Sequence, residues 1–282
     1  MNPYQKPARW FEPKNKIFPY QVGFTSPPHD FDAAPTDFLE IAPKGVGAHG
    51  RMIHVPDYDH SLAQRVDNFQ LLEEFVECMA NNGADVCAQV GSNWVHAGGK
   101  KPEDIRDFCK RVSDKYETPL HMAGYALVEA LREIGAEKIA LNGVYHWPDW
   151  WQGKARYLRD AGFDVVWAGN FVDQGFFATQ EESNDCNWVF PHAMAAQSMQ
   201  YVAEQAPQAD AIVVNGMCNF RRADTGLTER IVSLEVDLEA QIGKPIVASD
   251  TALYWRVFKS LRLAPKTPQG KLLSSLQVTD DE

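Results

Sequence analysis

The chain alternates between short apolar segments and longer segments with helical spacing, and this alternation constrains its fold more than any other feature. The short segments are 20–24, 85–90, 118–121, 138–142, 164–167, 211–215 and 245–248. Strands that alternate with helices form a parallel sheet covered by helices. Ligands of open parallel sheets bind beyond the carboxyl ends of the strands. We therefore expect an α/β protein whose functional residues lie at strand ends.

Most of the intervening segments carry apolar residues at helical spacing. We predict helices over 62–82, 102–116, 125–134, 149–161, 191–206, 227–241 and 251–261. Gly83 and Gly135 follow two of them, as is typical of residues that end a helix. Residues 45–50 match the G-x-G-x-x-G pattern of dinucleotide-binding proteins, but no strand precedes them and no clear helix follows. We interpret this stretch as a loop, a candidate flap over the cleft, and not as a dinucleotide site.

Charge and composition exclude several classes of protein. The net charge of −11 argues against a nucleic-acid-binding surface, which needs clustered basic residues. No apolar run is long enough to span a bilayer, and the polar N-terminus lacks an export signal, so we expect a cytoplasmic protein without membrane contact. The oligomeric state stays open, with a homo-oligomer as one option.

The cysteines indicate reduced thiols and no metal site. There are five, and no two of them form a C-x-x-C pair. No H-x-x-x-H motif is present, so we expect neither a metal nor another cofactor. Cys78, Cys87 and Cys109 lie in apolar patterns and are predicted to be small buried residues.

Two strand ends resemble each other and indicate an internal repeat. The segments 85–94 (DVCAQVGSNW) and 210–220 (DAIVVNGMCNF) both begin with aspartate, continue as an apolar strand, and end in glycine, a small or thiol residue, asparagine and an aromatic residue. The repeat would place Ser92 and Asn93 opposite Cys218 and Asn219 in one cleft. Backbone N–H groups at the helix start after a strand favour an anion, and Ser and Asn side chains add donors. These donors could hold a carboxylate or merely cap a helix.

Several further segments resemble the aspartate/glutamate racemase superfamily, within it the arylmalonate decarboxylase and maleate isomerase branch. They are 22–28 (VGFTSPP), 91–99 (GSNWVHAGG), 125–135 with 138–145, 219–221 (NFR) and 243–255 (GKPIVASDTALYW). The resemblance covers about 20–262. It implies two Rossmann-like parallel-sheet halves related by a pseudo-twofold axis, with a cleft between them. On this basis we expect one half from 16–119 plus 249–275, the other from 120–248, and terminal arms at 1–15 and 276–282.

The resemblance also implies where the reaction takes place. Racemase-type members use two thiols that face each other across the substrate, whereas the decarboxylases keep only the second and have glycine at the first position. Gly91 stands at that first position here, which disfavours a two-thiol racemisation. Ser92, Asn93 and Tyr145 match donors that hold the retained carboxylate. Pro27, Gly91 and Asn219 complete the predicted substrate-binding set.

The second thiol position is ambiguous. An alignment through 219–221 places it on Met217, and an alignment through the strand places it on Gly216. Cys218 fits only if the turn is rearranged, and it is otherwise a thiol packed under a helix start. If Cys218 is inert, His146 or His121 could be the acid, because imidazole titrates near neutral pH. Tyr145 and His146 are therefore candidate catalytic residues beside Cys218.

Tryptophans cluster near one of these strand ends and have two interpretations. They are Trp147, Trp150 and Trp151, with Trp94 and Trp188 elsewhere in the chain. They could form an apolar wall that desolvates a leaving carboxylate, or they could be core or a lid between the halves.

The sequence thus favours a cofactor-independent lyase or isomerase that acts on a small carboxylate through an enediolate-like intermediate. Decarboxylation of a malonate-type acid agrees best with Gly91. A maleate-type cis-trans isomerase or racemase is the nearest alternative. A non-catalytic carboxylate-binding protein is the alternative from another class.

Overall fold

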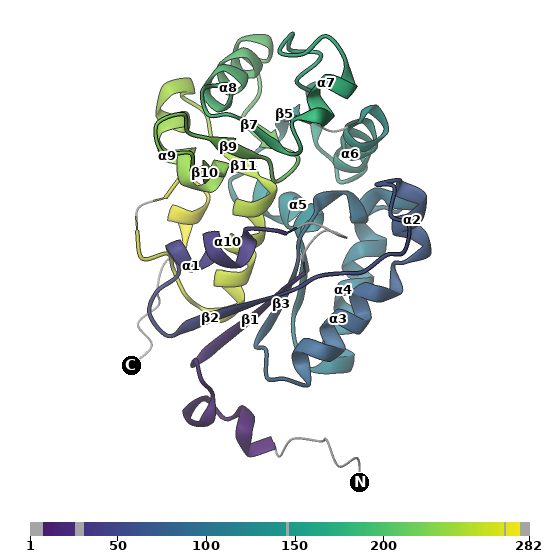
Figure 1. Cartoon of the computed structure of the whole chain (residues 1–282), viewed down its shortest axis with the longest axis vertical. Coiled ribbons are helices and arrows are strands. Elements are labelled where there is room, and N and C mark those ends of the chain that lie inside the picture. Colours follow the sequence, from purple (N-terminus) through teal and green to yellow (C-terminus); the bar gives the residue numbers. More distant parts are fainter. Residues whose placement is uncertain (1–7, 26–30, 145–146, 268, 277–282) are drawn as a thin grey trace.

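The computed structural model describes residues 8–25, 31–144, 147–267 and 269–276, which form two four-stranded parallel sheets (Figure 1). The first sheet has the order β2 (Val46–Arg51), β1 (Tyr20–Thr25), β3 (Val86–Gln89), β4 (Leu120–Met122). The second has the order β11 (Ile246–Ala248), β8 (Ala211–Val214), β5 (Lys138–Asn142), β6 (Asp164–Gly169).

Both sheets have the same topology. Numbered along the chain within each sheet, the strands run 2-1-3-4 in the first and, read from β6, 2-1-3-4 in the second. All pairings in both sheets are parallel. The expected α/β fold with two Rossmann-like halves is confirmed.

The two aspartates of the sequence repeat have equivalent positions in the two sheets. The backbone N–H of Asp85 donates to the carbonyl of Gln21 in β1, and Gln21 N–H donates back to the Asp85 carboxylate, both at 2.7 Å. Asp210 makes the same two bonds with Lys138 in β5, also at 2.7 Å. A carboxylate before the third strand therefore fixes the start of the first strand in each half.

Helices cover the sheets, and their bounds agree well with the helical spacing in the sequence. They are α1 (Ala34–Ile41), α2 (Leu62–Asp67), α3 (Gln70–Ala80), α4 (Pro102–Tyr116), α5 (Ala123–Glu133), α6 (Pro148–Asp160), α7 (Gln180–Asp185), α8 (Ala193–Gln205), α9 (Ile231–Ile242) and α10 (Ser249–Leu261). In α4, Pro102 stands at the first helical position, where its missing N–H costs nothing, and Ile105, Cys109 and Val112 form the buried face. The helix predicted over 62–82 is interrupted between α2 and α3.

Shorter elements complete the chain. The 3₁₀ helices are η1 (Ala8–Phe11), η2 (Pro13–Asn15), η3 (Ser92–Gly99) and η4 (Leu273–Ser275). A small third sheet has the order β10 (Thr228–Glu229), β9 (Asn219–Arg221), β7 (Val189–Pro191). It continues from the turn that ends β8, so it supports one wall of the space between the halves.

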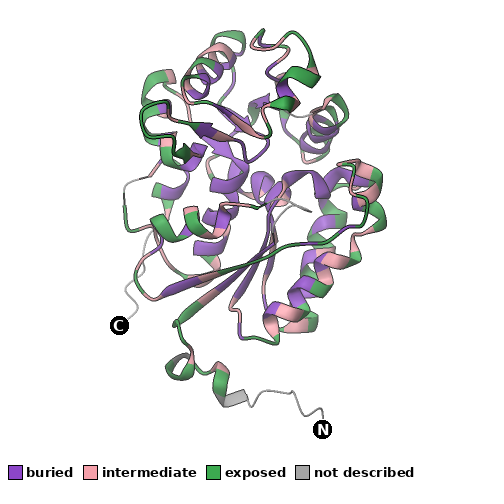
Figure 2. Ribbon diagram, viewed as in Figure 1, coloured by how far each residue is buried: buried purple, intermediate pink, exposed green. Residues whose placement is uncertain are grey.

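α5 and α10 join the two halves. Each follows the fourth strand of its own sheet, the two helices pack against each other, and both contact β4 and β11. Figure 2 shows that α10 and the central strands are largely buried. β4, which the predicted boundary at residue 119 assigns to the second half, pairs with β3 of the first sheet. The exact division of the chain remains a prediction.

The interpretation of residues 45–50 as a loop or flap is wrong. Gly45 lies in a turn, but residues 46–50 belong to β2, which pairs with β1 from Tyr20↔Val46 to Thr25↔Arg51. A Cβ atom on Gly47 would lie 2.1 Å from the ring of Phe18. Glycine at this position leaves room for the Phe18 ring to lie against the strand. Because glycine has no side chain, the segment lacks the apolar pattern by which strands are recognised.

No helix among the described residues is long and apolar enough to cross a membrane.

Candidate active site

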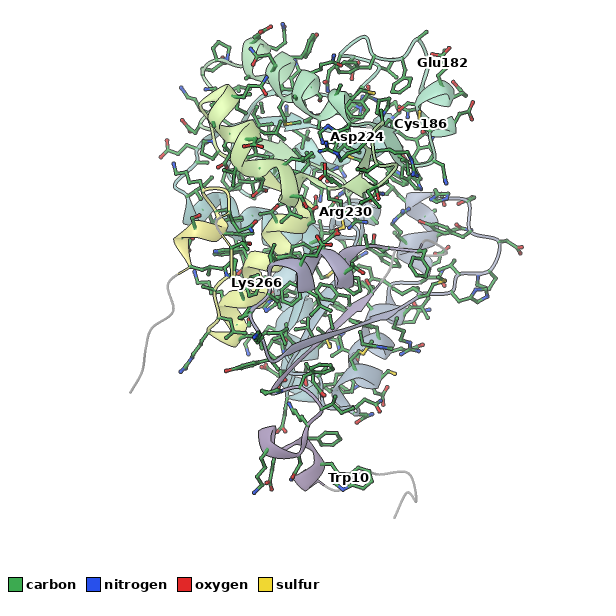
Figure 3. All side chains as sticks on the ribbon, turned by 60° about the vertical axis from the view of Figure 1, so that its left-hand side comes forward. Trp10, Glu182, Cys186, Asp224, Arg230 and Lys266 are labelled. Atoms are coloured by element: carbon green, nitrogen blue, oxygen red, sulfur yellow. The ribbon has the colours of Figure 1, made fainter. Side chains whose placement is uncertain are left out.

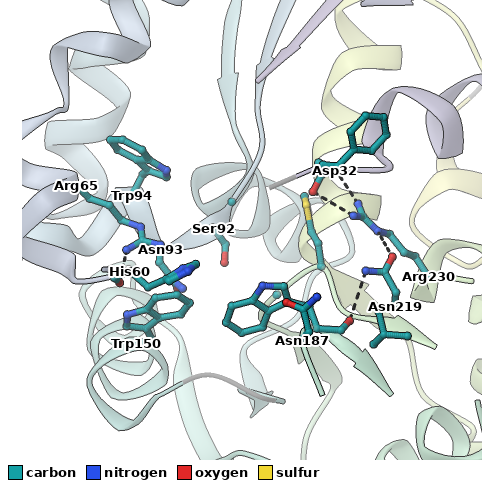
Figure 4. A pocket seen from close by; sticks show the side chains of 16 residues that line it. Asp32, His60, Arg65, Ser92, Asn93, Trp94, Trp150, Asn187, Asn219 and Arg230 are labelled. Carbon is teal, nitrogen blue, oxygen red and sulfur yellow. Dashed lines mark hydrogen bonds and ion pairs between the residues drawn. The ribbon is translucent and has the colours of Figure 1, made fainter. Parts of the chain in front are cut away.

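A cavity of about 470 Å³ lies between the two halves, where β3 and β8 end (Figure 4). The first half contributes Gly91, Ser92 and Asn93, and the second contributes Gly216 and Met217. The ligand site expected at the carboxyl ends of parallel strands is therefore present, with one strand end from each sheet.

The glycines in these two turns have positive φ angles, 94° at Gly91 and 136° at Gly216. Glycine adopts this conformation without steric cost. A Cβ on Gly91 would meet its nearest non-adjacent atoms at 3.6 Å, which is ordinary contact. The backbone conformation, and not lack of space, thus favours glycine at position 91.

Ser92 and Asn93 are linked directly to the second half. Ser92 Oγ donates to Asn215 Oδ1 at 2.5 Å, and Asn215 Nδ2 donates to Asn93 Oδ1 at 3.4 Å. As the first residues of η3, Ser92 and Asn93 have backbone N–H groups without a partner inside that helix. These groups provide donors for an anion in the cavity.

Arg230 lies on the side of the cavity formed by the second half. It is 3 % exposed, and its guanidinium binds both carboxylate oxygens of Asp32 at 3.1 and 3.2 Å. Its Nε donates to Asn219 Oδ1 at 3.2 Å and lies 3.4 Å from Asp37 Oδ2. Figure 3 places Arg230 between the two halves, in contrast to Asp224 above it. The ion pair of Asp32 with Arg230 therefore connects the first half to the second beside the cavity.

Arg65 and His60 lie on the opposite side of the cavity (Figure 4). Arg65, from α2, is 5 % exposed and donates to the carbonyl of His60 at 2.7 Å. Its guanidinium carbon is 4.6 Å from the ring centroid of Trp150. The cavity lining contains two arginines, Arg65 and Arg230, and one carboxylate, Asp32, so its net charge is positive. A positive lining favours anionic ligands even though the chain as a whole is acidic.

Three of the five clustered tryptophans, Trp94, Trp150 and Trp188, line the cavity. The rings of Trp150 and Trp188 are nearly parallel, with centroids 6.4 Å apart. Trp147 contacts both, at 4.5 and 5.6 Å. The interpretation as an apolar wall agrees with this arrangement.

The predicted site residues are not all at the cavity. Gly91, Ser92, Asn93 and Asn219 line it, and Cys218 does not. The Cys218 side chain is 1 % exposed and packs in the apolar core of the second half, where burial raises the pKa of its thiol. Met217 lines the cavity in its place, because the turn after β8 directs the preceding residue inward. Pro27, Tyr145 and His146 lie outside the described residues.

His121, the other alternative acid, does not line the cavity. Its Nε2 is 2.7 Å from Ser260 Oγ of α10, and desolvation lowers the pKa of His121 to about 3. An imidazole with this pKa is neutral at physiological pH and carries no proton to donate as an imidazolium. Within the described residues, no group of three His, Cys, Asp or Glu side chains is arranged to hold a metal ion.

Sequence reasoning missed His60, Arg65, Asp32 and Arg230. Arg65 and Arg230 are charged residues at buried positions. Apolar periodicity assigns charged residues to the exposed face, so it could not identify them. Asp32 and His60 stand in irregular segments, where no pattern marks them. A buried salt bridge between two distant segments leaves no signal in a single sequence.

We expect Asp37 to make the stability of the protein fall with increasing pH. Burial raises the pKa of Asp37 to about 7, although Arg230 opposes the shift, and Oδ2 accepts no hydrogen bond within the described residues. The folded state therefore holds a proton that the unfolded chain releases near pH 4. The stabilisation is complete below pH 4 and is lost as the pH rises to about 7, by about 4 kcal/mol in total.

Urea unfolding between pH 4 and 8 measures this dependence. Asp37→Asn should flatten it, and Asp224→Asn, at an exposed position, should not. Equal slopes in the wild type and Asp37→Asn would contradict the assignment.

Comparisons with known proteins agree with this architecture. The family model for arylmalonate decarboxylase matches residues 53–273. An unliganded arylmalonate decarboxylase structure superimposes with a TM-score of 0.66 at 16% identity, covering 91% of this chain and 99% of the other. The maleate isomerase of Pseudomonas putida S16 gives 0.68 at 17% identity, covering 92% and 99%. The maleate cis-trans isomerase of Nocardia farcinica gives 0.65 at 19% identity, covering 91% and 98%.

A search of curated proteins finds no match. The family match extends over most of the chain, and the structural likeness extends over both halves with the cleft between them. The resemblance inferred from the sequence motifs is thereby confirmed, and the chain belongs to the arylmalonate decarboxylase family.

Proposed function

We propose that this protein is a cofactor-independent enzyme that decarboxylates a malonate-type dicarboxylic acid. One observation carries the proposal. Ser92 and Asn93, whose backbone N–H groups have no partner inside η3, and two arginines line one cavity, while no described cysteine lines it. Such a cavity can hold a dianion, but it offers neither the paired thiols of a racemase nor the thiol nucleophile of an isomerase. Its described lining also lacks the second thiol that the family's decarboxylases keep, so decarboxylation here needs another proton donor.

The reaction divides into two steps. The bond between the α-carbon and one carboxyl carbon breaks and releases CO₂, and its electron pair moves into the retained carboxylate to form an enediolate. N–H groups at Ser92 and Asn93 stabilise the charge that develops on its oxygens. A proton then adds to the α-carbon.

His60 is the group proposed to deliver this proton. Among the described residues that line the cavity, it is the only one with an imidazole, the side-chain type suited to proton transfer at neutral pH, and the other ionisable residues are Asp32, Arg65 and Arg230. Asp32 is held by the two terminal nitrogens, Nη1 and Nη2, of the Arg230 guanidinium. The imidazole regains its proton from solvent after each turnover.

A substrate panel tests the proposal. The purified protein is incubated with substituted malonates, maleate and amino diacids, and ¹³C-labelled CO₂, fumarate and enantiomer ratios are followed by NMR and chiral chromatography. We expect CO₂ from at least one malonate. Fumarate without CO₂ would favour the isomerase alternative, and binding without turnover would favour a non-catalytic carboxylate-binding protein.

We expect Cys218→Ala to retain nearly the full decarboxylation rate. The thiol lies outside the cavity lining and its pKa is raised by burial, so it is badly placed to transfer a proton. The measurement is kcat for the variant and for the wild type before and after iodoacetamide treatment. A loss of two orders of magnitude in Cys218→Ala, with unchanged unfolding, would restore Cys218 as the acid.

A further inference from the structure

Lys154, in α6 of the second half, has an unusual environment for a lysine. Its side chain is fully buried, and within the described residues it forms no ion pair with a carboxylate. Its Nζ donates to the carbonyl oxygen of Ser92 at 2.6 Å. An apolar side chain would fill the same space without the cost of desolvating an amine. The role of this amine is therefore to be sought at the Ser92 turn, which it contacts.

Two glycines in the helices around Lys154 make space for this contact. Gly124 of α5 faces it, and a Cβ there would lie 2.3 Å from Ser92 O and 2.7 Å from Lys154 Nζ. Gly153, next to Lys154, allows α6 to approach η3, since a Cβ would lie 2.6 Å from the His96 ring. Two glycines thus leave room for the lysine to reach the Ser92 carbonyl.

The contact acts on the peptide that joins Ser92 to Asn93. In a trans peptide the carbonyl and the N–H point in opposite directions, so the Asn93 N–H points away from Lys154. Ser92 and Asn93 line the cavity, and Lys154 does not. A donor at the carbonyl polarises the peptide and makes its N–H a stronger donor.

We propose that Lys154 is a positioning residue, whose Nζ fixes the Ser92 carbonyl and so orients and strengthens the Asn93 N–H toward a bound carboxylate. The ligand class rests on the function proposed above. Negative charge on the retained carboxylate increases as the enediolate forms, so a stronger donor assists the transition state more than the bound substrate. Burial lowers the pKa of Lys154, and the neutral amine also donates hydrogen bonds.

Lys154→Met tests the proposal, with Tyr157→Phe as its matched control. Tyr157 lies one turn further along the same helix, is fully buried, and has a hydroxyl without a hydrogen-bond partner among the described residues. We expect Lys154→Met to lower kcat about tenfold or more with little change in KM, since loss of a whole oxyanion donor costs about 10²–10³-fold. Tyr157→Phe should change neither parameter.

A readout in the free protein keeps this test separate from the proposed function. In Lys154→Met the ¹⁵N resonance of the Asn93 amide should shift, because its peptide loses a hydrogen bond, and in Tyr157→Phe it should stay. An unchanged Asn93 resonance, or an unchanged kcat, would overturn the role of Lys154. A shifted resonance in a protein without turnover on the substrate panel would support the contact and reject only the proposed decarboxylation.

If Lys154→Met does not fold, Lys154→Gln replaces it, because glutamine keeps a buried donor. Its amide is one bond shorter than the lysine side chain, so the hydrogen bond should lengthen. We expect a smaller shift of the Asn93 resonance in the same direction and a partial loss of kcat. No shift in the folded Lys154→Gln protein would overturn the proposal.

Discussion

Replacing His60 by glutamine is expected to lower kcat for decarboxylation by about 10²–10⁴-fold, the usual contribution of a general acid. Glutamine has a similar size and can donate a hydrogen bond, but it cannot transfer a proton at neutral pH. The alkaline limb of the pH–rate profile, which reports the protonated imidazole, should disappear with it. Steady-state kinetics between pH 5 and 9 measure both effects.

His54→Gln is the matched control, because His54 lies in the same segment, is exposed and does not line the cavity. Its kcat and pH profile should equal those of the wild type. His146→Gln separates His60 from the acid predicted from the sequence. If that variant loses the rate and His60→Gln keeps it, the proton comes from His146.

The second large effect concerns stability. Arg230→Met should reduce the free energy of unfolding by about 3–5 kcal/mol, the range for removing one partner of a buried ion pair. Arg230 is 3 % exposed and is the partner of Asp32 and, at 3.4 Å, of Asp37. Its loss leaves the buried Asp32 carboxylate without a countercharge. Chemical denaturation at pH 7 measures the change.

A double-mutant cycle tests whether the pair is the cause. Asp32→Leu alone should also destabilise, whereas Asp32→Leu with Arg230→Met should be clearly more stable than the sum of the two losses predicts. Arg222→Met serves as the control, since the Arg222 pair with Asp224 is exposed and contributes little. Additive losses in the double variant would contradict the assignment.

The strand ends could be predicted from the sequence because their signals are local. Apolar runs that alternate with helical segments predicted the parallel sheets. The repeat of aspartate, strand, glycine and asparagine predicted the two turns that face the cavity. Asp85 and Asp210 even make the same pair of hydrogen bonds in the two halves. β2 was missed because its glycines interrupt the apolar pattern of a strand, and one of them, Gly47, accommodates the Phe18 ring.

By itself the sequence determined the fold class and the internal repeat, because each depends on neighbouring residues along the chain. Only the tertiary structure decided which side chain of the turn after β8 faces the cavity: Met217 does and Cys218 does not. It also brought Arg230 to Asp32 and Lys154 to Ser92, over 198 and 62 residues of chain. Such contacts arise when separate elements pack, and no local pattern of residue types encodes them.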